Sequence, residues 1–533
     1  MNDSTINNHE EEDNVEFDDD YLPQFSPLWE RLIGPGAIGA SVVALILAIC
    51  AMIITYSDPP MQITVFKKTP AVEVIDKPDE PELTIEEKIE IPVDTVTDTI
   101  IADVILAEIE ETNNDEDFKE AKGEPDEVSR VDFDSKSFSQ TIGASGNPGG
   151  IKGNKRGSRL NTIKGIGATR KTESAVFAAL DWLRRHQSKN GMWDLESYTN
   201  TCGTEKKKGR CAGDGNAAFN IGGSAASLLA FTGHGLDHLV SSKYKTTITK
   251  SMNYLKSQQK NDGCFGNPVG EHLYNQSIAT FALADLLMMS DDNKALKSSI
   301  EKGIEYLLDA QNDNEGGAWR YNNYRIHPEA RSEADGLIND TSVTTWVVMA
   351  LKTADSCGIK VDPKGFQGAS KWLDSCYNEE KDGKYEKVGT FAYTMDSAGK
   401  HIKVNNRFFA PTACGVLSRQ FMKQSKGVLP GANTMIQSLP DWDGVRDMYY
   451  WYYGSMAMFQ VQGDHWEQWN EAMKNALTKN QHNKRSLCLH GSWDPEETVW
   501  GADYGGRIYT TAMGALTLEV YYKYGVIDPK KTQ

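Results

Sequence analysis

A repeated spacing of apolar and polar positions runs through the C-terminal two thirds of the chain. Counting back from Gln187, the fourth, seventh and eleventh residues are apolar, and the same three positions are apolar before Gln259 and Gln311. This spacing puts the apolar residues on one face of a helix, with charged residues on the opposite side. A glycine and then an aromatic residue follow each glutamine, as in Gly191 and Trp193. The pattern predicts a repeat unit built on an amphipathic helix whose end is covered by the aromatic ring.

A second kind of helix is predicted after each of these units. These segments are rich in Ala, Gly, Ser and Thr and nearly free of charge, which indicates that both of their faces are covered. We expect these inner helices at 217–233, 277–289, 341–354, 411–423, 448–460 and 509–524. We expect their amphipathic outer partners at 172–188, 246–260, 295–311, 365–377 and 466–481, with a degenerate one within 431–442.

The alternation of the two kinds of helix predicts an all-α fold class. Six outer and six inner helices make an (α/α)6 toroid over residues 172–525. An open solenoid is the alternative, but it requires polar capping repeats at both ends. The last predicted helix, with Leu516, Leu518 and Val520, is as apolar as the others. A closed ring is therefore favoured.

The chain before the toroid has a different composition. Residues 1–130 carry 32 acidic and 8 basic residues, a net charge of −24, which leaves +5 for the remainder. Residues 33–56 contain no charge, and an apolar run of about this length spans a bilayer as a helix. A cleaved signal peptide is the alternative, but the preceding segment is acidic rather than basic. The predicted segments are a disordered acidic tail (1–32), a transmembrane helix (33–56), an acidic linker with prolines (57–140), a Gly-rich basic hinge (141–171) and a C-terminal tail (526–533).

These features limit the kinds of partner that we expect for the chain. We expect a single-pass membrane protein whose toroid is extracytoplasmic, and the acidic linker leaves room for docking of a protein partner. The near-neutral charge of the toroid argues against a nucleic-acid partner, which would require clustered Lys and Arg.

The cysteines do not indicate a disulfide framework. Cys202 and Cys211 could close a small hairpin in an oxidising compartment, and two unrelated free thiols are the alternative. His234 and His238 are interpreted as part of a surface loop, because no third metal ligand accompanies them.

The repeat formed by Trp182, Leu183, Gln187, Gly191 and Trp193 resembles the glutamine-tryptophan motif of the triterpene cyclases. Segments such as NDTSVTTWVVMAL, MYYWYYGSMAMFQ and GSWDP resemble membrane-anchored bacterial prenyltransferase or squalene-cyclase repeat proteins of the terpenoid cyclase/protein prenyltransferase class. The resemblance implies an α/α toroid in which the motif braces the helices and performs no chemistry.

The catalytic motifs that the resemblance implies are not intact. In class II cyclases an Asp within a D-x-D-D-T pattern protonates the substrate, and the matching residues here are Leu337, Ile338, Asn339, Asp340 and Thr341. The position of the proton donor is therefore Asn339.

Prenyltransferases of this class bind zinc through an Asp, a Cys and a His. Asp374 and Cys376 have a suitable spacing but fall at the end of an outer helix, and Tyr509 and Thr510 stand where a histidine ligand is expected. We therefore predict no metal and no cofactor.

Candidate chemistry is expected where the inner helices begin. In such a ring the N-termini of these helices meet at one mouth, and their unpaired N–H groups attract polar ligands. The candidate catalytic residues are Asp340 and Asp503. The candidate substrate-binding residues are His272, Asn275, Asn339, Arg407, Asp447, Tyr450, Trp500, Tyr504 and Arg507. Helix capping is the alternative role for any one of them.

Three functions remain open from the sequence. The first is binding of a hydrophobic, isoprenoid-like or extended ligand without cyclase chemistry. The second is an active isoprenoid-lipid enzyme, and the third is a carbohydrate-active toroid, either a glycosidase or a polysaccharide lyase. The third would require paired carboxylates, or a base with an arginine, for which Asp340 with Asp503 or Arg407 are the candidates.

Overall fold

The computed structural model describes residues 167–203, 207–312, 316–326, 339–395, 401–402, 409–495, 498–499 and 504–523. The predicted acidic tail, membrane span, linker and C-terminal tail lie outside the described residues. No helix within the described ranges is long and apolar enough to cross a membrane, and residues 33–56 lie outside these ranges.

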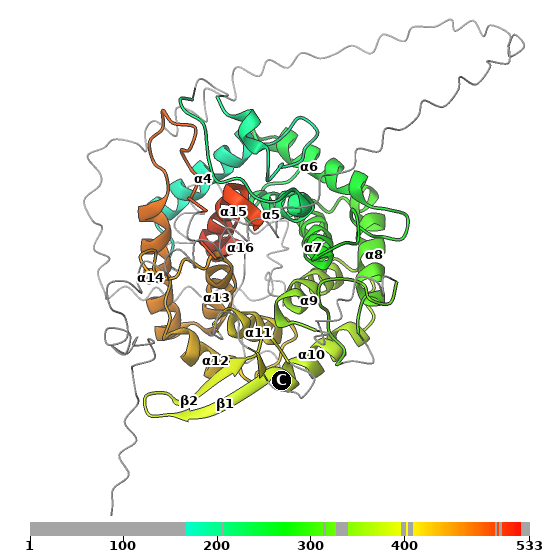
Figure 1. Cartoon of the computed structure of the whole chain (residues 1–533), viewed down its shortest axis with the longest axis vertical. Helices are drawn as coiled ribbons and strands as arrows, with labels where there is room; N and C mark the ends of the chain where they lie inside the picture. The colour runs from blue at the N-terminus through cyan, green and yellow to red at the C-terminus, as the bar shows by residue number, and fades with distance from the viewer. Residues whose placement is uncertain are drawn as a thin grey trace, which may run out of the picture. The chain divides into compact units, whose positions relative to one another are not determined.

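Six helices of the described chain form an inner ring (Figure 1). They are α5 (Asn220–Gly233), α7 (His272–Ser290), α9 (Thr341–Ser356), α11 (Phe409–Phe421), α13 (Met448–Val461) and α15 (Gly506–Leu518). Each packs against the next, and α15 packs against α5, so the ring is closed. Most residues of these helices are buried, in agreement with sequences that contain few charges.

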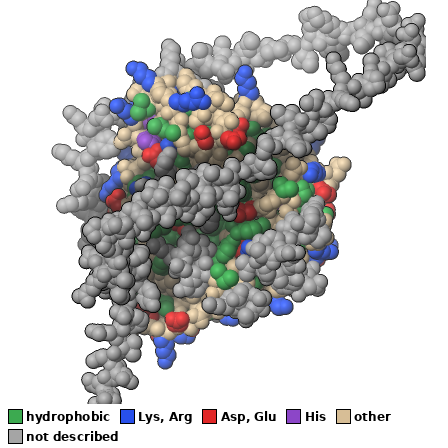
Figure 2. Space-filling view, in the orientation of Figure 1, with side chains coloured by type: hydrophobic (Ala, Val, Ile, Leu, Met, Phe, Trp, Pro, Cys, Tyr) green, Lys and Arg blue, Asp and Glu red, His purple; other side chains and the backbone are tan. Residues whose placement is uncertain are grey.

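Six further helices in the described part of the chain lie outside this ring (Figure 1). They are α4 (Arg170–Arg185), α6 (Lys245–Gln258), α8 (Asn293–Asp309), α10 (Lys364–Cys376), α12 (Val428–Met435) and α14 (Gly463–Asn480). The first, α4, contacts both α14 and α15, which joins the beginning of the double ring to its end. The short α12 occupies the place where the sequence predicts a degenerate helix. On the face shown in Figure 2, Lys and Arg side chains gather toward the rim.

The repeat residues hold consecutive outer helices together. The Gln187 side-chain amide donates hydrogen bonds to the Gly191 carbonyl (3.0 Å) and to the Thr247 carbonyl in α6 (3.0 Å). The Trp193 indole N–H donates to the Leu183 carbonyl (2.8 Å), so the ring covers the end of α4 as the pattern predicts. The motif is therefore a brace between helices.

A further copy of this brace closes the ring. The Gln481 amide donates to the Gly491 carbonyl (2.9 Å) and to the Ala175 carbonyl in α4 (2.8 Å). The Trp493 indole donates to the Leu477 carbonyl (2.9 Å). This copy is hidden in the sequence because ten positions, rather than four, separate its glutamine from its glycine.

The strictly all-α prediction is wrong in one place. Two antiparallel hairpins follow α10, formed by β1 (Tyr377–Asp382) with β2 (Glu386–Phe391) and by β3 (Thr394–Met395) with β4 (His401–Ile402). The first hairpin begins where Tyr377 replaces the repeat glutamine. A tyrosine cannot donate the two bonds of the brace, and its ring instead packs on Phe391, 5.0 Å away between centroids. Short 3-10 helices η3 (Tyr198–Thr201) and η5 (Ala217–Phe219) and the final turn α16 (Val520–Lys523) complete the described elements.

Candidate functional site in the centre of the ring

A cavity lies among the first turns of the inner helices. The cavity has a volume of about 140 Å³, roughly ten times the minimum that one water molecule requires. Every inner helix contributes to its lining. The contributing residues include Gly222 and Ala226 (α5), Tyr274 and Ile278 (α7), Ser342 and Trp346 (α9), Pro411 and Cys414 (α11), Tyr449 (α13), and Tyr509 and Met513 (α15).

The wall of the cavity is predominantly aromatic and aliphatic. The Trp346 and Tyr449 rings meet edge to face with centroids 6.5 Å apart, and Phe219 lies 5.4 Å from Tyr504. Burial raises the pKa of the Tyr274 and Tyr449 hydroxyls well above the ordinary value. These phenols therefore stay neutral and present apolar rings with a few hydroxyl groups to the space between them.

Asp340 lies immediately behind this wall. It is the N-cap of α9, where its Oδ1 accepts hydrogen bonds from the Val343 N–H (2.8 Å) and the Ser342 hydroxyl (2.6 Å). Its Oδ2 is buried and has no hydrogen-bond partner among the described residues. Burial raises the pKa of Asp340 to about 6, against the opposing effect of the bonds from Ser342 and Val343. A carboxyl group with this pKa can hold or release a proton near neutral pH.

A short chain of hydroxyls connects Asp340 to the cavity. The Ser342 hydroxyl is 2.6 Å from the Tyr274 hydroxyl, and both residues line the cavity. Each hydroxyl can donate one hydrogen bond and accept another, so a proton can move along this chain by rotation of the O–H groups. Asp340 can thereby act on the cavity without touching its contents.

A second carboxylate, Glu271, lines the cavity itself. It is the residue before α7. Burial raises its pKa, and the negative charge of Asp340 raises it further. The two acids therefore influence each other, as paired carboxyl groups do in many acid–base sites.

Three tyrosine hydroxyls add polar groups to the lining. Tyr321 and Tyr393 share a hydrogen bond between their hydroxyls. The Tyr509 hydroxyl is buried and has no hydrogen-bond partner among the described residues. All three residues line the cavity, and among them the Tyr509 hydroxyl is the polar group that is available to orient a bound molecule.

Two of the predicted binding residues line this cavity: Asn275 and Tyr504. The Asn275 amide is already occupied, since its oxygen accepts from the Gly222 N–H (2.8 Å) and its nitrogen donates to the Ala218 carbonyl (2.8 Å). Asn275 therefore holds α7 against the start of α5, whereas Tyr504 presents its ring to the cavity.

Five other predicted binding residues are buried or cap helices away from the cavity wall. His272 lies 3.5 Å from the Cys264 sulfur, and Asn339 accepts a hydrogen bond from Asn312. The remaining three also bond to the protein: Asp447 caps α13, Tyr450 donates to the Met435 and Ser438 carbonyls, and Arg507 donates to Ala212, Ser492 and Asp494. In the structure these contacts connect neighbouring elements.

Arg407, Trp500 and Asp503 lie outside the described residues. Their predicted binding or catalytic roles therefore stay predictions, as does the pairing of Asp340 with Asp503 or Arg407.

The surface-loop interpretation of His234 and His238 is wrong. Both side chains are buried, with 3% and 6% of their surface exposed. His238 Nε2 lies 2.9 Å from the carboxylate of Asp292, and the His234 ring packs edge to face against Phe177. The histidines help attach the loop after α5 to its neighbours. Within the described ranges, the one group of side chains spaced to hold a metal contains neither of them.

Sequence reasoning missed several cavity residues. Glu271 directly precedes the predicted His272, so an acid at the start of an inner helix was a usable signal. Tyr321 and Tyr393 stand in connections between helices, far apart in the chain, and no spacing rule brings them together.

Comparisons with known proteins agree with this architecture. Residues 160–394 match the family model of the squalene-hopene cyclase C-terminal domain, which confirms the resemblance to terpenoid cyclase toroids over that part of the chain. No curated protein sequence matches the chain.

Several solved structures are similar at low identity. A cellobiose 2-epimerase from Spirochaeta thermophila DSM 6192 shares 13% identity, with 68% of this chain and 97% of that chain covered and a TM-score of 0.46. An alpha-1,6-mannanase from Salegentibacter sp. HEL1_6 shares 12%, covering 66% and 98%, with a TM-score of 0.43. A variant of the type II terpene cyclase MstE from Scytonema, in complex with merosterolic acid A, shares 11%, covering 69% and 99%, with a TM-score of 0.39.

Proposed function

Because residues 160–394 match the squalene-hopene cyclase C-terminal domain, we propose that the central cavity of the toroid binds a hydrophobic, isoprenoid-like ligand. The observation that carries the proposal is the wall of the cavity, which is built from aromatic and aliphatic side chains of all six described inner helices. Apolar surface of a ligand gains free energy when it leaves water for such a wall.

The same wall argues against a sugar as the preferred ligand. A polyhydroxylated molecule loses its hydrogen bonds to water on entry and needs many replacements. Asn275 has its amide oxygen and nitrogen engaged by the protein, and the Tyr321 and Tyr393 hydroxyls bond to each other. An isoprenoid with a single polar head group requires far fewer partners, and the Tyr509 hydroxyl and Glu271 could provide them.

The predicted membrane span is consistent with this class of ligand. A helix at residues 33–56 would keep the toroid beside a bilayer, which is where isoprenoid lipids concentrate. We propose accordingly that the chain is a single-pass membrane protein with an extracytoplasmic toroid.

An active isoprenoid-lipid enzyme is the second candidate. It is favoured by the buried Asp340, whose pKa is raised to about 6, and by its hydroxyl chain to the cavity. The cyclase proton-donor position is Asn339, which carries no acidic proton. Any acid catalysis would therefore have to begin at Asp340, which reaches the cavity through Ser342 and Tyr274, or at Glu271, which lines the cavity itself.

Filling the cavity tests the binding proposal. Ala226 is on the wall, so Ala226→Leu extends a larger side chain into the space. We expect the affinity for geranylgeraniol, measured by native mass spectrometry or isothermal titration, to fall at least about tenfold, which corresponds to about 1.4 kcal/mol. Ala472→Leu on α14, in the outer ring, is the matched control and should bind normally.

Two results would contradict the proposal. One is the absence of binding by the wild-type chain to geranylgeraniol and farnesol, and the other is preferential binding of a mannose or glucose oligosaccharide that Ala226→Leu abolishes. Release of a cyclised or hydrolysed product by the wild-type chain, lost in Asp340→Asn, would support the enzymatic candidate.

A further inference from the structure

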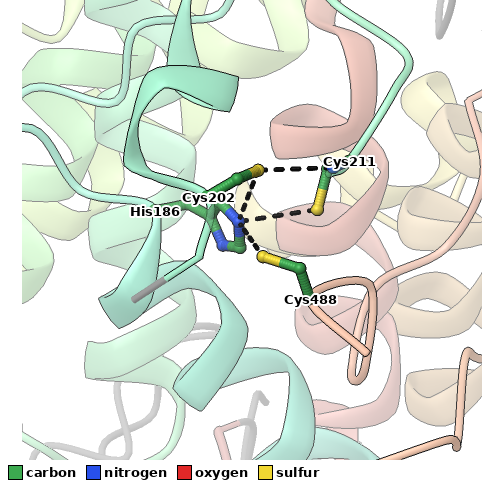
Figure 3. A group of neighbouring side chains, drawn as sticks. All are labelled: His186, Cys202, Cys211 and Cys488. Carbon is green, nitrogen blue, oxygen red and sulfur yellow. Dashed lines mark hydrogen bonds between the residues drawn. The ribbon is translucent and has the colours of Figure 1, made fainter. Parts of the chain in front are cut away.

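Four side chains that can ligate a metal meet away from the cavity. His186 caps the end of α4, Cys202 and Cys211 flank the segment after η3, and Cys488 lies in the loop after α14. Figure 3 shows the three sulfur atoms turned toward the same edge of the imidazole ring. Their ligand atoms all lie within 4.8 Å of one another. Three of the four residues are buried and Cys202 is half-buried.

The spacing of these atoms matches a tetrahedral zinc site. Zinc bonds of about 2.3 Å to sulfur and about 2.0–2.1 Å to nitrogen, at tetrahedral angles, put the sulfur and nitrogen atoms about 3.6 Å apart. The distances from His186 Nε2 to the sulfurs are 3.6 Å for Cys202, 3.5 Å for Cys211 and 3.3 Å for Cys488. A metal ion can therefore enter with small movements of the side chains.

The tautomer of His186 is already set for metal binding. Its Nδ1 lies 2.8 Å from the Trp182 carbonyl, which can only accept a hydrogen bond, so Nδ1 carries the proton. In a neutral imidazole Nε2 then bears the lone pair, and Nε2 is the atom that faces the sulfurs. A carbonyl partner for the second nitrogen is the usual support of a zinc-bound histidine. The ring also stacks on Trp182, with centroids 4.1 Å apart, which fixes its orientation.

The surroundings suit the charge of such a site. Three thiolates around one divalent ion leave a net negative charge. The buried Arg185 guanidinium donates to the Cys488 carbonyl (3.3 Å) and stands 3.9 Å from the Cys488 sulfur. The Cys211 backbone N–H also points at the Cys202 sulfur, 3.3 Å away. Both contacts stabilise sulfur in its thiolate form.

We propose that His186, Cys202, Cys211 and Cys488 bind a structural Zn²⁺ ion. Four protein ligands complete the tetrahedron and leave no open position for substrate, which distinguishes a structural site from a catalytic one. The ligands come from the first outer helix, from the segment after it and from the loop that follows the last outer helix. The ion therefore holds together the seam of the ring, where the beginning of the toroid at α4 meets the loop after α14. Backbone hydrogen bonds between Lys208 and both Ser486 and Cys488 lie beside it.

This proposal replaces both sequence-based interpretations of Cys202 and Cys211. They are free thiols rather than a disulfide, and they are not unrelated, because both face His186. The sequence did not reveal the site because His186 and Cys488 are 302 positions apart and the first two cysteines are separated by eight residues, which is longer than common zinc-binding spacings.

Metal content tests the proposal directly. We expect the full chain, purified under reducing conditions, to contain one zinc ion per molecule by inductively coupled plasma mass spectrometry. Replacement by Co²⁺ should give the visible absorption of a tetrahedral cobalt–thiolate centre. Cys488→Ser should lose most of the zinc, and chelation of the wild-type metal should lower its melting temperature.

A matched control is available in the same chain. Cys264 also faces a histidine, with its sulfur 3.5 Å from His272 Nε2, but the described residues provide no further thiol at that pair. Cys264→Ser should keep the full zinc content. If Cys488→Ser does not fold, Cys488→His, which retains a ligand atom, should keep zinc.

Three outcomes would overturn the proposal. The first is a folded wild-type chain without zinc or another bound metal after growth in zinc-supplemented medium. The second is zinc that survives in folded Cys202→Ser and Cys488→Ser variants. A Cys202–Cys211 disulfide found by mass spectrometry in freshly isolated membranes would likewise rule out the site in the native protein.

Discussion

At the scale of single residues, Asp340 is a buried acid with a raised pKa, although the cyclase pattern assigns the proton donor to the neighbouring position, Asn339. Burial raises its pKa from 3.8 to about 6. Between these pH values the folded chain holds more protons at this carboxyl group than the unfolded chain does. The contribution to folding stability is therefore fully present below about pH 4 and is lost as the pH rises to about 6.

Asp340→Asn should remove this pH dependence. The amide is nearly isosteric and its oxygen can still accept from Val343 and Ser342, but it does not titrate. We expect the free energy of unfolding of the wild type, relative to the variant, to fall by about 2 kcal/mol between about pH 4 and pH 6. Urea denaturation at several pH values across this range measures the difference. An unchanged difference over the whole range would show that Asp340 has an ordinary pKa.

Asp292→Asn provides a control of opposite sign. Asp292 also caps a helix, accepting from the Ala295 N–H at 3.1 Å, but its pKa is lowered, first by its hydrogen bond with His238. Its contribution is present above its ordinary value of 3.8 and is lost only as the pH falls further. The stability difference between wild type and Asp292→Asn should therefore change only below about pH 4.

At the scale of helices, the glycine of the repeat determines how closely outer helices approach. Gly191 has φ +95°, and a Cβ atom added there would lie 2.2 Å from the Lys250 carbonyl oxygen in α6. We expect Gly191→Ala to lower the free energy of unfolding by about 2–5 kcal/mol, the sum of left-handed strain and overpacking.

Gly358→Ala separates the two effects. Gly358 has φ +76°, but a Cβ atom added there would have no heavy atom within 4 Å beyond its chain neighbours. This variant should lose only about 1–2 kcal/mol through backbone strain. Urea denaturation compares the two, and equal losses would mean that the contact with Lys250 contributes nothing.

The same repeat explains how far the sequence predicts the fold. Apolar positions at a constant spacing before a Gln and a Gly locate the outer helices in the sequence. Runs of small uncharged residues locate the inner helices. The prediction failed at Tyr377, where one substitution removes the brace and a hairpin takes its place. The outer helix at 466–481 was predicted and is α14, but the brace at Gln481 was not recognised, because a longer loop separates the glutamine from its glycine.

The site was less predictable than the fold. Helix beginnings could be located, so Asp340, Asn275 and Tyr504 were found in or beside the cavity. Whether a side chain at a helix start faces the cavity or a neighbouring helix depends on rotation about the helix axis. Tyr450 and Tyr449 are adjacent in sequence, yet only Tyr449 lines the cavity, because Tyr450 turns toward the Met435 carbonyl. Sites assembled across the seam, such as His186 with Cys488, depend on ring closure itself.

At the scale of the whole molecule, ring closure makes a prediction that an open solenoid does not. Gln259 joins α6 to α8 inside the ring, where its amide donates to the Ser299 carbonyl (2.8 Å) and to Gly263 (3.3 Å). Gln481 makes the equivalent pair of bonds across the seam. In a closed ring no pair of neighbouring outer helices stands at an end. The braces at Gln259 and Gln481 are therefore equivalent parts of one cooperative structure.

We therefore expect Gln481→Ala and Gln259→Ala to lower the free energy of unfolding equally. Each loses two hydrogen bonds worth about 1 kcal/mol apiece, or about 2 kcal/mol in total. Urea denaturation of both variants should give single transitions with the slope of the wild type, since a ring without ends unfolds as a unit. In an open solenoid the terminal joint would fray independently. Gln481→Ala would then leave the main transition unchanged while Gln259→Ala shifted it, and that asymmetry would refute a closed ring in solution.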